Sequence, residues 1–156
     1  MRFAAYAGTV QFGGILVAAG LCVLIGPSCV QVDGGAVEAG WDLRFPDGRR
    51  TDDDGNSVSC TQTGMDRMVL VLQPIAGGVD PCVGQSHCQF SCSSQGVGTT
   101  DFVIPPAEYS ISLHVVDKAG KSLASVDGVV TPGPVVRQVS TGEITSLNVN
   151  LIIVSR

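Results

Sequence analysis

The sequence predicts an all-β protein: a single antiparallel β-sandwich of about seven to eight strands, preceded by an N-terminal signal or hydrophobic segment. Three observations support this prediction. Apolar and polar residues alternate in several short segments, turn residues separate these segments, and strong helix formers do not gather in any window. The length of 156 residues is enough for one domain of this kind.

The first 28 residues are predicted to be a signal peptide. Arg2 is their single charged residue, and residues 15–26 form an uncharged, apolar run. A helix that spans a bilayer needs about 20 apolar residues, whereas the apolar region of a signal peptide needs about 7–15. The run at 15–26 has the length of a signal peptide, so we expect export from the cytoplasm.

The residues that follow this run resemble the cleavage site of bacterial lipoprotein precursors, in which a cysteine becomes the lipidated N-terminus. Cys29 follows the small residue Ser28, as in that family, while Gly26 and Pro27 depart from its usual pattern. The resemblance implies that Cys29 is lipidated and that the protein is held in the cell envelope, on the outer membrane. Two or more acyl chains suffice for stable anchoring.

The cysteine count supports the same interpretation. Of six cysteines, Cys22 leaves with the signal peptide and Cys29 carries the lipid, which leaves four that can pair completely. Residues 29–40 are rich in glycine and alanine, and we expect them to form a flexible tether. The sandwich is then expected to occupy residues 41–156.

The strands of the sandwich are predicted in order along the chain. Residues 41–45 alternate apolar and charged side chains, and residues 68–72 form the continuous apolar run of a more central strand. Shorter strands are expected at 87–92 and 99–104. Residues 109–115 alternate again, short strands follow at 121–126 and 134–140, and the last strand covers 147–153. In that strand Leu147, Val149, Leu151 and Ile153 are expected to face the core.

Residues 103–120 contain two prolines, Tyr109, an alternating strand and an Asp-x-x-Gly turn that begins at Asp117. This segment resembles a hairpin of bacterial Ig-like and prealbumin-like envelope modules, although Ala107 stands where those modules usually have glycine. The resemblance implies an Ig-like sandwich and, because a fold hosts many functions, it implies no activity.

The four remaining cysteines are predicted to form disulfides, because an exported protein meets an oxidising compartment. Cys88 and Cys92 are expected to lie on one strand, about 13 Å apart, and therefore do not pair with each other. Two pairings remain. We prefer Cys60–Cys92 with Cys82–Cys88, since the second pair flanks a short turn; the alternative is Cys60–Cys88 with Cys82–Cys92.

No metal or other cofactor is expected, although two groups of residues invite comparison with metal sites. A zinc site would use His87 with Cys82, Cys88 and Cys92, but the spacing lacks C-x-x-C, and His87 and Cys88 would point to opposite faces of a strand. A calcium site would use the acidic segment 52–56, but the glycine and glutamate that complete an EF-hand loop are absent. A solvated acidic loop is the preferred interpretation.

No catalytic residue is predicted. His114 lies on the polar face of its strand without a nucleophile or acid motif, and nothing in the sequence pairs Glu108 with Glu143. The net charge of −5, with nine basic residues, argues against a nucleic-acid partner.

We therefore expect a membrane-anchored envelope lipoprotein with a non-catalytic binding or structural module, whose partner is an envelope protein or a glycan. The alternatives are a calcium- or zinc-dependent envelope protein, and an accessory subunit of an envelope complex that pairs through a sandwich edge.

Overall fold

The computed structural model describes residues 32–61 and 63–155. The chain divides into Met1–Gln31 and Val32–Arg156, and the second unit contains all the strands described below. The predicted signal peptide, Cys29 and the first residues of the predicted tether lie outside the described residues. In the described part of the chain, no helix is long and apolar enough to cross a membrane.

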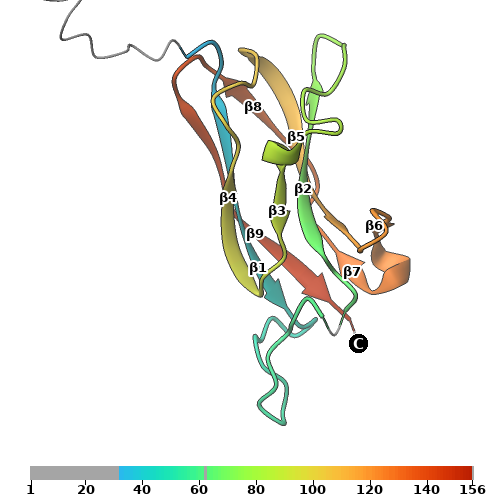
Figure 1. Cartoon of the computed structure of the whole chain (residues 1–156). Helices are drawn as coiled ribbons and strands as arrows, with labels where there is room; N and C mark the ends of the chain where they lie inside the picture. The colour runs from blue at the N-terminus through green and yellow to red at the C-terminus, as the bar shows by residue number, and fades with distance from the viewer. Residues whose placement is uncertain (1–31, 62, 156) are drawn as a thin grey trace, which may run out of the picture. The chain divides into compact units, whose positions relative to one another are not determined.

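The second unit is a β-sandwich of two sheets, as predicted (Figure 1). One sheet has the order β4-β1-β9-β7, with bounds Gln95–Thr99, Ala36–Arg44, Ile144–Val154 and Val129–Val130. The other has the order β3-β2-β5-β6, and β8 also pairs with β5; the bounds are Gln89–Ser91, Arg67–Pro74, Ala107–Val116, Ser122–Leu123 and Val135–Val139. Two 3₁₀ turns, η1 (Ser86–Cys88) and η2 (Ser125–Asp127), connect strands.

The first strand begins earlier than predicted. β1 starts at Ala36, so the tether prediction is wrong for residues 36–40. These small residues are strand residues because β1 lies between β4 and β9, where Ala36, Val37 and Ala39 are fully buried. The pairing of β1 with β9 is parallel, whereas every other pair of named strands in the described residues is antiparallel.

The pattern of side chains that face the core shifts by one residue halfway along the last strand, β9. Glu38 pairs with Ser146, whereas Gly40 pairs with Val149, so β9 carries one extra residue at a bulge. Asn148 occupies it with a φ of 58°, a left-handed conformation that asparagine tolerates better than most residues. Leu147 faces the core on one side of the bulge, and Ile152 and Val154 do so on the other. The prediction that Val149 and Leu151 face the core is therefore wrong: both are more than half exposed.

Three short strands also differ from the predicted ranges. Of the predicted range 99–104, only Thr99 belongs to a named strand, because the strand in this region is β4, at Gln95–Thr99. The range 87–92 starts with the 3₁₀ turn η1, and the range 121–126 keeps only the two residues of β6 as strand. Gly96 and Gly98 give β4 little of the side-chain alternation on which the strand predictions depend.

The glycines of β4 make room for an aromatic pair. Trp41 and Phe90 stack with ring centroids 6.1 Å apart, and they join the two sheets near the β4 margin of the sandwich. A Cβ atom at Gly98 would lie 2.2 Å from Cγ of Phe90, and one at Gly96 would lie 2.5 Å from the Trp41 ring. Both positions therefore need glycine for packing rather than for a turn.

Candidate functional site

The four cysteines form two disulfides. Cys60 pairs with Cys92 and Cys82 with Cys88, with Cα–Cα distances of 6.0 and 5.5 Å. These are the pairs preferred from the sequence. One premise of that preference is wrong, however, because Cys88 ends the 3₁₀ turn η1 and does not share a strand with Cys92.

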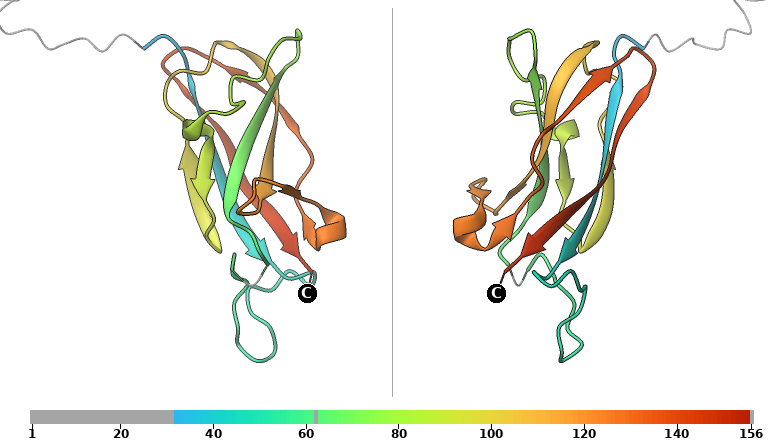
Figure 2. Two further views of the ribbon diagram at one scale, coloured as in Figure 1. Left: turned by 45° about the vertical axis from the view of Figure 1, so that its right-hand side comes forward. Right: turned by 180° about the vertical axis from the view of Figure 1, so that it is seen from behind.

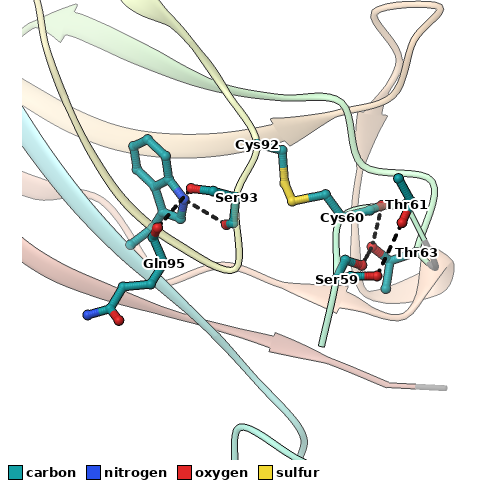
Figure 3. Close-up of a disulfide and its surroundings, with 8 residues drawn as sticks. Ser59, Cys60, Thr61, Thr63, Cys92, Ser93 and Gln95 are labelled. Carbon is teal, nitrogen blue, oxygen red and sulfur yellow. Dashed lines mark hydrogen bonds between the residues drawn. A yellow bond between two sulfur atoms is a disulfide. The ribbon is translucent and has the colours of Figure 1, made fainter. Parts of the chain in front are cut away.

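The Cys60–Cys92 disulfide attaches the loop that follows β1 to the end of β3 (Figure 3). Hydrogen bonds hold both sides: Thr63 donates its hydroxyl to the carbonyls of Ser59 and Cys60, and the amide of Cys92 donates to the carbonyl of Asp66. The indole of Trp41 donates to the carbonyl next to Cys92, at Ser93, over 3.0 Å. The Cys60–Cys92 disulfide and the Trp41–Ser93 hydrogen bond therefore connect a surface loop to the aromatic pair Trp41 and Phe90.

The zinc site considered from the sequence loses its sulfur ligands. Cys82, Cys88 and Cys92 are all engaged in disulfides, so they offer no thiolate to a metal. His87 lies in η1 rather than on a strand. Within residues 32–61 and 63–155, no group of three or more His, Cys, Asp or Glu side chains is arranged to hold a metal ion.

The acidic loop after β1 extends from one end of the sandwich (Figure 1) and closes on itself. Oδ1 of Asp52 accepts hydrogen bonds from the amides of Asp54 and Asn56, at 3.0 and 2.8 Å. Arg49 forms ion pairs with Asp47 and Asp53, and its hydrogen bonds hold the pKa of Asp47 below its usual value. One of the calcium ligands considered from the sequence, the Asp52 carboxylate, thus already accepts hydrogen bonds from amides of its own loop.

A buried carboxylate lies where the sequence suggested an outward, solvated one. Asp42 of β1 is only 3% exposed, and its Oδ2 accepts hydrogen bonds from Arg44 (Nε, 2.8 Å) and Arg50 (2.9 Å). Burial by itself raises the pKa of Asp42, but the two guanidinium groups outweigh it and leave the pKa below its usual value. Asp42 is therefore ionised at neutral pH and is unsuited to the role of a general acid.

Asp42 also contributes to a small pocket. The pocket has a volume of about 170 Å³, and its other polar lining residues are Arg50, Ser57, Ser94 and Gln95. Oδ1 of Asp42 is buried and accepts no hydrogen bond from the described residues. The only sequence signal for this cluster was the closeness of Asp42 to Arg44 and to the Arg49-Arg50 pair.

Another titratable residue considered from the sequence, His114, lies on β5. His114 shares a 3.0 Å hydrogen bond with the hydroxyl of Ser112, two residues earlier on β5. Among the described residues, no carboxylate hydrogen-bonds to His114, so the pair lacks the acid that orients histidine in a catalytic triad.

The outward side of the β4-β1-β9-β7 sheet carries exposed apolar residues, and we call it the outer face. Val97, Val149 and Leu151 are 65%, 59% and 53% exposed, and Val130 of β7 is 46% exposed. Gly40 of β1 pairs with both Val97 and Val149, so these two valines flank a strand position that has no side chain. A gathering of exposed apolar side chains on one sheet is typical of an interaction surface.

Comparisons with known proteins identify no relative: no protein family, no curated protein and no solved structure matches this chain.

Proposed function

We propose that this protein is an exported envelope lipoprotein, held in the outer membrane by lipid on Cys29, whose sandwich serves as a non-catalytic binding or structural module. The outer face is its binding surface, and the partner is an envelope protein or a glycan.

The observation that carries this proposal is the disulfide pattern. All four cysteines of the described domain are paired, a state that persists in oxidising compartments and is rare in the cytosol. An exported chain agrees with the apolar run at 15–26. Once the domain's own cysteines are paired, Cys29 and Cys22 are the two left for other chemistry, and Cys29 is the one that follows the apolar run.

The titratable groups support a non-catalytic role. The buried carboxylate, Asp42, is neutralised by two arginines and has a lowered pKa, whereas a general acid needs a raised one. The exposed apolar surface is instead suited to binding.

Fractionation of cells that produce the full chain tests the anchor. The wild type is expected in the membrane fraction, and Cys29→Ser in the soluble envelope fraction or as an unprocessed precursor. Cys22→Ser is the matched control, because that cysteine lies inside the predicted signal peptide, and it should behave as the wild type. A Cys29→Ser protein that is processed normally and stays in the membrane fraction would rule out lipid anchoring.

A further inference from the structure

β4 is an edge strand, and no strand of residues 32–61 and 63–155 pairs with its far side. It ends the strand order β4-β1-β9-β7, and Figure 2 (left) shows it, in yellow, at the margin of the sandwich. The amide of Leu43 donates to the carbonyl of Ser94, and the amide of Thr100 donates to the carbonyl of Val37. Because hydrogen-bonded positions alternate in an antiparallel pair, the backbone groups of residues 94, 96, 98 and 100 face β1.

The backbone groups of Gln95, Val97 and Thr99 consequently point away from the sheet. One of them, the carbonyl of Gln95, accepts a hydrogen bond from the hydroxyl of Ser93, which leaves it a second lone pair. Natural proteins usually protect such an edge with a charged side chain, a proline or a bulge. β4 contains no charged residue and no proline, and its register with β1 is regular.

We infer that β4 pairs with β4 of a second copy of this chain. The strand reads Gln-Gly-Val-Gly-Thr, which is nearly symmetric about Val97. Antiparallel pairing about Val97 places Val97 opposite its counterpart and Gln95 opposite Thr99 on both sides. These are the three positions whose backbone groups are open, and each such pair exchanges two hydrogen bonds. The resulting contact is two-fold symmetric, the commonest arrangement of homodimers.

The side chains of β4 fit this pairing. Val97 lies on the outer face, so the two valines of the dimer meet on the same side of a continuous sheet. Gly96 and Gly98 point inward toward Trp41 and Phe90 and have no side chain to obstruct an approaching strand. The paired edge also joins the apolar residues of the two outer faces, including Val149 and Leu151, into one surface.

This pairing is separate from the proposed lipid anchor and does not depend on it. It specifies the occupant of the β4 edge as a second copy rather than a strand of another protein, because the register of the edge is self-complementary. The net charge of −5 on each chain opposes association at low salt, so the test belongs at physiological ionic strength.

The molecular mass of the purified full chain in detergent, measured by sedimentation over a range of concentrations, tests the pairing. We expect a dimer for the wild type. Val97→Lys places two like charges opposite each other, so its dissociation constant should rise at least about tenfold. Val149→Lys is the matched control, because Val149 is nearly as exposed as Val97, lies on the same face and also pairs with Gly40. The dimer of this variant should persist.

Cross-linking gives a second, geometric measurement. Cα atoms of a hydrogen-bonded antiparallel pair lie about 5.5 Å apart, within the range that a disulfide spans. Val97→Cys should therefore form a covalent dimer under mild oxidation, and Val149→Cys should not. The inference is overturned if the wild type stays monomeric at every concentration. This holds even if the β4 edge pairs with another protein instead. The inference is also overturned if Val97→Lys and Val149→Lys weaken the dimer equally.

Discussion

Gly98→Ala tests whether the glycines of β4 are required for packing against the aromatic pair. The added Cβ would lie 2.2 to 2.4 Å from three atoms of the Phe90 ring, far inside a normal contact distance. The ring must move, which disturbs its stacking on Trp41. Overpacking of this kind costs about 1–3 kcal/mol, and the smaller unfolded-state entropy of alanine returns about 0.4–1 kcal/mol. We expect a net loss of about 1–2 kcal/mol.

A double-mutant cycle separates packing from other effects. The free energy of unfolding is measured by urea titration under non-reducing conditions for the wild type, Gly98→Ala, Phe90→Ala and the double variant. Without the Phe90 ring, the Cβ atom at position 98 loses its three closest contacts. The cost of Gly98→Ala should then fall by more than about 1 kcal/mol and can change sign, because the entropic gain of alanine remains.

Gly133→Ala is the control for the glycine substitution itself. A Cβ atom at Gly133 meets nothing within 4 Å, and the residue has no positive φ, so its replacement should be neutral or slightly stabilising. If Gly98→Ala costs the same with and without the Phe90 ring, the packing explanation is refuted. A loss for Gly133→Ala equal to that for Gly98→Ala would refute it as well.

Three further predictions follow from the ion pairs, the disulfides and the acidic loop. Asp42→Asn should lower the free energy of unfolding at pH 7 by about 1–3 kcal/mol. Because the pKa of Asp42 is lowered in the folded state, its stabilisation is present above about pH 4 and is lost as the pH falls through the folded value, so wild type and variant should converge in acid unfolding curves. Replacing Cys60 and Cys92 by serine should cost about 3–4 kcal/mol, and replacing Cys82 and Cys88 about 2 kcal/mol, since the closed loops are 32 and 6 residues long; the reverse order in urea titrations would contradict this. Excess calcium and then chelator should give the same melting temperature, whereas a site at 100 times its dissociation constant would add about 2.7 kcal/mol.

Local alternation of apolar and polar residues predicted the strands that span the sandwich. β5 is the clearest case: Tyr109, Ile111, Leu113 and Val115 are all buried on one face. Tyr109 also donates its hydroxyl to the carbonyl of Pro105, the residue four positions earlier. This strand could be predicted because β2 pairs with it in unbroken register, so a period of two persists along its length.

Alternation failed where a neighbouring strand set the register. β1 begins at Ala36 because it pairs with β9, more than 100 residues away in the sequence. The bulge at Asn148 reverses the faces of the second half of β9, and this exposes Val149 and Leu151. Nothing within residues 147–153 shows the bulge, since it arises from pairing with the strand beside it.

The all-β class, the main strands and the preferred pairing of the cysteines could be predicted from the sequence, because they depend on side-chain periodicity and spacing along the chain. The sequence also contains the apolar run and Cys29, on which the proposed anchor rests. Three features became visible only in the folded domain: the parallel β1–β9 pair, the burial of Asp42 beside two arginines, and the exposure of the outer face and the β4 edge. Those features depend on which strands meet and in which register, and that choice is made by the packing of the whole sandwich rather than by any local segment.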